Sequence, residues 1–138
     1  MPDALFLPPD LVGRWAFERI VDDRRAGSRL TATGSAVFSR TGEAAIAWSE
    51  QGVLRLPDGE VPVEAHRVLR LDDARSWTVD FADGRGFHPW AVGAPLVHDC
   101  APDVYRGRLD PAPSGWTMRW EAAGPAKDYV IETTYRRV

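Results

Sequence analysis

The sequence predicts an all-β fold, a single antiparallel up-and-down β-barrel of about eight to ten strands with very little helix. Three observations lead to this prediction. Apolar and polar residues alternate with a period of two through most of the chain, turn signals rich in Gly, Pro and Asp recur about every ten residues, and the loops between strands are short. A meander of hairpins favours a barrel over a sandwich, because closing the sheet removes its edges.

The N-terminal part predicts one helical turn and a hairpin. The Pro8-Pro9 pair is expected to introduce a helical turn at Asp10-Leu11-Val12, which would close one end of the barrel. A strand is expected over residues 13–21, where one face carries Trp15, Phe17, Arg19 and Val21. The polar turn at residues 22–28 leads into a second strand over 29–39, so the two form a hairpin.

The next strands are expected over residues 43–50, 53–56 and 61–71, separated by Gln51-Gly52 and by the Pro57-Asp58-Gly59 turn. Small residues such as Ala45 and Ala47 share one face of the first of these strands. We expect that face to line the inside of the barrel and to leave room for a ligand.

The C-terminal part predicts six further strands, over residues 76–81, 85–88, 96–100, 104–109, 116–121 and 127–138. Irregular segments are expected at 89–95, at Ala101-Pro102 and at 110–115, where prolines interrupt the pattern. Ala82-Asp83-Gly84 is a strong tight-turn signal between two of the strands.

Composition narrows the class of protein. The length of 138 residues fits a single domain spanning 1–138, and a net charge of -3 gives no electrostatic footprint for nucleic acid or an anionic membrane. The opening MPDALFLPPD lacks the basic and apolar regions of a leader, and no segment is apolar enough to span a bilayer, so we expect a cytoplasmic protein. The lone Cys100 permits no internal disulfide and no cysteine-rich zinc site. The oligomeric state is open, with a homodimer as one option.

Gly13-Arg14-Trp15 resembles the start of the lipocalins and their calycin relatives, in which a Gly-x-Trp follows a short helical turn. The resemblance implies that an arginine near the end of the last strand, Arg136 or Arg137, packs over Trp15. The chain is also similar to a bacterial family of lipocalin-like domains of unknown function. The motifs that carry this second resemblance are Asp83-Gly84-Arg85-x-Phe87-His88, His98-x-Cys100, Asp103-x-Tyr105-x-Gly107 and Gly124-Pro125-x-Lys127-Asp128-Tyr129.

Polar residues that could converge inside the barrel lie mainly in its C-terminal half. His98 and Cys100 share one strand face, Asp103 and Tyr105 share another, and Lys127 and Tyr129 share a third. The full candidate ligand-binding set is Arg85, His88, His98, Cys100, Asp103, Tyr105, Trp120, Lys127 and Tyr129. A bulge at Pro102 would turn one of these pairs outward.

Each candidate also has a structural interpretation. His88 and His98 are equally typical of hydrogen-bonded core histidines, and Cys100 is typical of a small buried hydrophobe. Lys127-Asp128 is also typical of a solvated pair at a strand start. A zinc site from His88, His98 and Asp103 has suitable ligand types, but its spacing matches no known motif, so no metal is predicted.

Three functions remain open at this point. The leading one is the binding of a small, largely hydrophobic molecule in the barrel cavity, without a cofactor. The second is an enzyme that uses His98 with Asp103 or Tyr105 as acid–base groups. The third is haem binding through His88 or His98, by analogy with barrels that ligate haem through one histidine.

Overall fold

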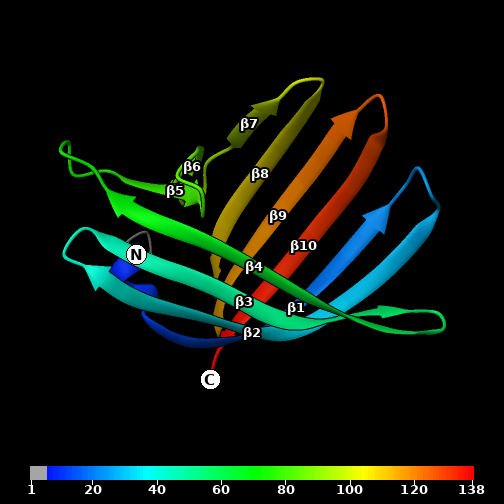
Figure 1. The fold of residues 1–138 in the computed structure, drawn as a ribbon, viewed down its shortest axis with the longest axis horizontal. Coiled ribbons are helices and arrows are strands. Elements are labelled where there is room, and N and C mark those ends of the chain that lie inside the picture. Colours follow the sequence, from blue (N-terminus) through cyan, green and yellow to red (C-terminus); the bar gives the residue numbers. More distant parts are fainter. Residues whose placement is uncertain (1–5) are drawn as a thin grey trace.

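In the computed structural model, which describes residues 6–138, ten antiparallel strands form one sheet that curves into a nearly closed barrel (Figure 1). A turn of 3-10 helix, η2 (Pro8–Leu11), precedes the strands. The strands are β1 (Gly13–Asp23), β2 (Ser28–Gly42), β3 (Ala45–Leu56), β4 (Gly59–Leu71), β5 (Trp77–Phe81), β6 (Gly86–Pro89), β7 (Leu96–Cys100), β8 (Asp103–Ala112), β9 (Gly115–Gly124) and β10 (Lys127–Arg137). The predicted all-β, up-and-down class is confirmed.

The order of strands in the sheet is β6-β5-β4-β3-β2-β1-β10-β9-β8-β7. The first and last strands pair with each other, so the sheet ends at β6 and β7, and the segment between these edges closes the seam. The Trp90 amide donates to the Trp77 carbonyl at 2.9 Å, and the Gly93 amide donates to the Leu109 carbonyl at 2.8 Å. The seam is therefore closed by single hydrogen bonds rather than by a strand ladder.

The hydrophobic core lies at one end of the barrel, beneath η2. Trp116 and Tyr135 stack there with ring centroids 4.0 Å apart, and Trp15 and Phe38 pack edge-on against Trp116. Leu11, on η2, is completely buried against this cluster. The expected helical turn is confirmed, although it covers Pro8–Leu11 rather than Asp10–Val12.

Arg137 is the C-terminal arginine that covers Trp15. Its guanidinium carbon lies 4.0 Å from the Trp15 ring centroid, and it donates to the Asp10 and Val12 carbonyls at 2.7 and 3.0 Å. Arg136 points away and pairs with Glu18 at 3.3 Å. The last strand is thus joined to the helical turn, as the lipocalin resemblance implies.

Two expectations for the segment around β3 are wrong. Residues 45–56 form one strand, because Gly52 pairs with Gly34 at a close approach of two backbones rather than making a turn. The inner face of β3 carries Ile46 and Trp48, both buried, whereas Ala45 and Ala47 lie on the outer face. The small residues inside the barrel are on β2 instead, at Ala32, Gly34 and Ala36, where the register places them beside Arg19, Phe17 and Trp15.

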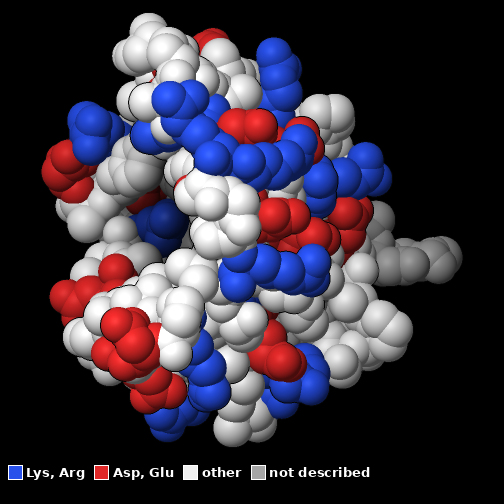
Figure 2. Space-filling view, turned by 90° about the vertical axis from the view of Figure 1, so that its right-hand side faces the viewer, with Lys and Arg blue, Asp and Glu red and all other residues white. Residues whose placement is uncertain are grey.

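The opposite end of the barrel is open. The hairpin turns β1–β2, β3–β4, β7–β8 and β9–β10 splay apart there, along the top and right of Figure 1. Figure 2 looks onto that end and shows a hollow with atoms of a basic side chain inside it.

Two remaining sequence expectations concern membranes and leaders. Among residues 6–138 no helix has the length and apolar character to cross a bilayer. The expectation of no leader in residues 1–10 falls partly on residues 1–5, which lie outside the described residues.

Candidate functional site

The open half of the barrel contains a cavity with two adjoining parts. The outer chamber has a volume of about 340 Å³, and the inner chamber, towards the core, has about 130 Å³. Four residues line both chambers and so lie where the chambers adjoin: Arg67, Phe87, Trp120 and Ile131.

Parallel aromatic rings form one wall of the cavity. Phe81 stacks on Phe87 with ring centroids 4.5 Å apart and an interplanar angle of 16°, and Phe87 stacks on Trp120 at 5.1 Å and 14°. Phe87 comes from the short edge strand β6, whereas Trp120 comes from β9 on the far side of the seam. The stack is therefore assembled only when the barrel closes.

Six of the sequence-predicted residues line the outer chamber: Arg85, His98, Cys100, Tyr105, Trp120 and Tyr129. The register explains why three of them converge. His98 pairs with Tyr105, Tyr105 with Ala122, and Ala122 with Tyr129, so these side chains form one row on the inner face. No bulge at Pro102 turns a pair outward.

Lys127 and Asp103 lie at the rim, next to the chamber rather than in its lining. The Lys127 ammonium donates to the Tyr105 hydroxyl at 2.7 Å and pairs with Asp103 at 3.1 Å. Hydrogen bonds from Lys127 to these two groups raise the pKa of the ammonium. The alternative interpretation, a solvated Lys127–Asp128 pair, is not what forms, since Asp128 lies 3.8 Å from Arg24.

Of the two acid–base pairs in the enzyme hypothesis, His98 with Asp103 does not form, whereas His98 and Tyr105 are neighbours across β7 and β8 with ring centroids 6.1 Å apart. His98 Nδ1 donates to the Phe87 carbonyl at 3.1 Å, a bond that spans the seam from β7 to β6. Asp103 pairs with Lys127 rather than with His98. His98 therefore has a structural role at the seam, and its Nε2 is the atom left for a ligand.

Cys100 is exposed at the end of β7 and lines the chamber mouth, so the expectation of a buried hydrophobe is wrong. The end of a hairpin at the open rim leaves no neighbours to cover it. Among the described residues, no group of three or more His, Cys, Asp or Glu is placed to hold a metal ion, and this includes His88, His98 and Asp103.

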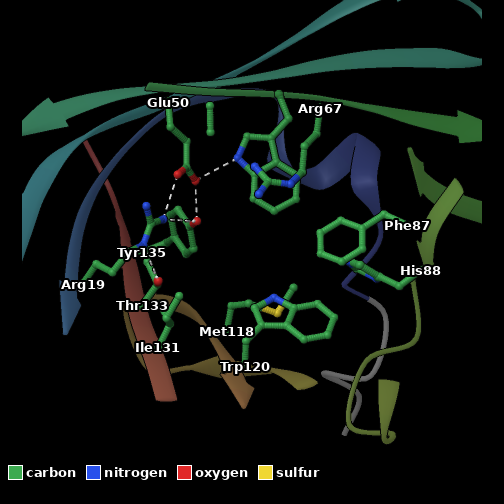
Figure 3. A pocket seen from close by; sticks show the side chains of 12 residues that line it. Arg19, Glu50, Arg67, Phe87, His88, Met118, Trp120, Ile131, Thr133 and Tyr135 are labelled. Atoms are coloured by element: carbon green, nitrogen blue, oxygen red, sulfur yellow. Dashed lines mark hydrogen bonds and ion pairs between the residues drawn. The ribbon is translucent and has the colours of Figure 1, made fainter. Parts of the chain in front are cut away.

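A polar network that the sequence analysis did not identify lies in the inner chamber, where Figure 3 shows Glu50, Arg19 and Tyr135 on one side of the cavity. Glu50 is 3% exposed and accepts hydrogen bonds from Arg19 at 2.7 Å, from the Trp48 indole at 3.0 Å and from the Tyr135 hydroxyl. Burial and the Glu50 charge raise the pKa of Tyr135, so its hydroxyl remains a donor. The sequence pattern that could have identified Arg19 as an inward-facing residue is its position among Trp15, Phe17 and Val21 on one strand face.

His88 lies on the other side of the cavity (Figure 3). It pairs with the completely buried Val79 and is itself 5% exposed. Its Nδ1 donates to the Pro89 carbonyl at 2.7 Å, and its Nε2 is buried without a partner among the described residues. Burial and, to a smaller extent, the nearby Arg67 charge lower the pKa of His88 to about 4 against the opposing effect of the hydrogen bond to the Pro89 carbonyl, so the ring is neutral at pH 7.

Replacing Gly107 by alanine is expected to displace Trp120 from the aromatic stack. A Cβ at Gly107 would lie 2.5 Å from the Trp120 ring, so the ring must move, at a cost of about 1–3 kcal/mol in the free energy of unfolding. Urea unfolding measures this cost. Gly42→Ala is the matched control, because a Cβ there meets nothing within 4 Å; equal effects of the two substitutions would contradict the contact.

Fold and cavity together define a small lipocalin-like barrel with a hollow, aromatic-walled end. The chain belongs to the family described as "Family of unknown function (DUF6314)", which matches residues 11–137. No curated protein matches the chain in sequence.

Solved structures share the fold at low sequence identity. An S-type phycobiliprotein lyase, CPES from Guillardia theta, has a TM-score of 0.71 at 13% identity, over 95% of this chain and 90% of that one. The structure of EF1p2_mFAP2b bound to DFHBI has a TM-score of 0.50 at 12% identity, over 93% of this chain and 94% of that one. At these identities the likeness establishes the fold alone.

Proposed function

We propose that the protein binds a small, largely hydrophobic molecule with a flat, unsaturated body in the two-chambered cavity. The observation that carries this proposal is the stack of Phe81, Phe87 and Trp120 along the cavity wall. The three rings together form an extended aromatic surface on this wall, and such a surface favours an unsaturated, planar guest.

The size and polarity of the cavity support the same class of ligand. A chamber of about 340 Å³ lies within the usual range for small-molecule sites, and its lining combines apolar rings with a few polar atoms from His98, Tyr105 and Tyr129. Burial and the adjacent Tyr105 raise the pKa of Tyr129 to about 12, so this hydroxyl stays neutral. The structure of EF1p2_mFAP2b, which has a similar fold, is bound to DFHBI, and this supports a small-molecule ligand for a barrel of this kind.

Binding of phenylnaphthylamine, a neutral probe that fluoresces strongly in apolar sites, tests the proposal. The wild-type protein is expected to bind it, and Phe87→Ala is expected to weaken the binding about tenfold, since Phe87 lies in the middle of the stack. Val97→Ala is the matched control, because Val97 is 47% exposed on the neighbouring β7 and does not line the cavity. Absence of binding to the wild type, or equal binding by the two variants, would contradict the proposal.

Native mass spectrometry of protein purified from its own host identifies what the cavity carries. An additional mass that is lost in Phe87→Ala and kept in Val97→Ala is the expected result. The absorbance spectrum of the same sample separates the haem alternative, which requires a Soret band.

A further inference from the structure

Arg67 is a cation in the cavity without a carboxylate partner. It comes from β4, lines both chambers and lies between two aromatic faces, with its guanidinium carbon 5.6 Å from the ring centroids of Trp48 and of Phe87. Among residues 6–138 its side chain makes no hydrogen bond and no ion pair with another side chain or with the backbone. Its five N–H donors are therefore available to whatever occupies the cavity.

The other charged side chains that line the two chambers already have partners of opposite charge. Arg19 pairs with Glu50 at 2.7 Å, and Arg85 pairs with Asp83 at 2.8 Å at the mouth. Charged groups removed from water are normally paired, and cation–π contacts supply only part of that compensation. The lining thus has one uncompensated positive charge, at Arg67, and an occupant with one negative charge would neutralise it.

His88 supplies the complementary acceptor. A carbonyl oxygen only accepts hydrogen bonds, so the bond from Nδ1 to the Pro89 carbonyl fixes the ring proton on Nδ1. Nε2 then has a lone pair and no proton, and within the part of the chain that the structure describes it is buried without a partner, on a side chain that is 95% buried and lines the inner chamber. An unpartnered buried acceptor costs free energy unless a ligand donates to it.

We propose that the ligand is a planar organic anion that also carries an N–H or O–H donor, with Arg67 binding its acidic group and His88 Nε2 accepting from its donor. Figure 3 shows both side chains at the same cavity, with Arg67 reaching in from the upper strand and His88 next to Phe87. This inference rests on the proposed function and assigns the polar chemistry of its ligand.

Two probes that differ in one charge test the Arg67 part. Anilinonaphthalene sulfonate has the ring system and the amine of phenylnaphthylamine plus one sulfonate. Wild-type protein is expected to bind the sulfonate about tenfold more tightly than phenylnaphthylamine, and Arg67→Gln is expected to abolish this preference, measured as the ratio of the two affinities within each variant. Arg70→Gln is the matched control and should retain the preference, because Arg70 lies on the same strand, pairs with Asp80 at 3.1 Å and lines neither chamber.

The outcomes separate the two proposals. Equal binding of both probes to the wild type, or a preference that persists in Arg67→Gln, would overturn the anion site while the apolar cavity stands. Failure of both probes to bind would overturn the proposed function itself.

A third probe, phenoxynaphthalene, replaces the amine N–H of phenylnaphthylamine by an ether oxygen and tests the His88 part. The wild type is expected to prefer the amine about fivefold, and His88→Phe, which has no acceptor, is expected to lose this preference. The preference is the ratio of the two probe affinities for the same variant, so a general change in the pocket that affects both probes equally does not alter it. His88→Gln offers an amide oxygen and should restore part of it; an unchanged ratio in His88→Phe would overturn the role of His88.

Discussion

Glu50→Ala is expected to lower the free energy of unfolding by about 3 kcal/mol, the largest effect of any single substitution considered for this barrel. The carboxylate accepts from Arg19, Trp48 and Tyr135, so its removal leaves a cation and two further donors in the inner chamber without their acceptor. We place the cost at the low end for broken buried pairs because Arg19 is 20% exposed and can recover some hydration. The measurement is the urea midpoint with the wild-type m-value.

Glu60→Ala is the matched control for this experiment. Glu60 lies 3.8 Å from Arg55 and both side chains are 55% exposed, so its removal should cost less than 1 kcal/mol. A double variant, Glu50→Leu with Arg19→Met, should be more stable than Glu50→Ala because no buried charge is left alone. If Glu50→Ala costs no more than Glu60→Ala, the network does not stabilise the fold.

Acidification from pH 7 to pH 5 is expected to remove about 2 kcal/mol of stability through His88 alone. Burial, followed by the Arg67 charge, lowers the pKa of His88 to about 4 in the folded state, against 6.5 for the free side chain. Between these two values the unfolded chain binds the proton and the folded protein does not, so stability falls as the pH falls. The contribution of His88 to the free energy of unfolding is fully present above pH 6.5 and is lost as the pH falls to 4.

The difference between wild type and His88→Gln isolates this contribution, since all other groups titrate in both proteins. Unfolding curves at pH 7, 6 and 5 should show a wild-type loss that exceeds the loss in His88→Gln by about 2 kcal/mol. Val97→Ala, which removes no titratable group and alters an exposed side chain, should follow the wild type. Parallel pH dependences in wild type and His88→Gln would show that His88 titrates normally.

The fold could be predicted closely because period-two alternation and turn chemistry are local signals. The strands from β5 to β10 begin and end within a few residues of the predicted ranges, and Ala82-Asp83-Gly84 does join β5 to β6. The prediction failed at Gly52, where a glycine was interpreted as a turn. A glycine is required at position 52 because its backbone closely approaches that of Gly34, and this contact depends on β2, a strand elsewhere in the chain.

Part of the candidate site could be predicted for the same reason. His98, Tyr105 and Tyr129 share one inner row because alternation fixes the face of each strand and the antiparallel register aligns the rows. Alternation did not reveal Glu50, because Ala45 and Ala47 on the other face of β3 suggested a small-residue interior. The charge of Glu50 is compatible with burial only because Arg19 and Tyr135 reach it from β1 and β10.

By itself, the sequence determined the all-β class, the order of the strands and which residues alternate inward, because these depend on neighbours along the chain and on adjacent hairpins. Only the tertiary structure decided which inward residues are paired and which are left unpartnered. Arg19 and Arg67 look alike in the sequence, as arginines on apolar strand faces, yet one pairs with Glu50 and the other faces the cavity between two rings. The physical reason is that compensation of a charge depends on groups brought within about 4 Å by closure of the barrel, and sequence separation contains no information about that distance.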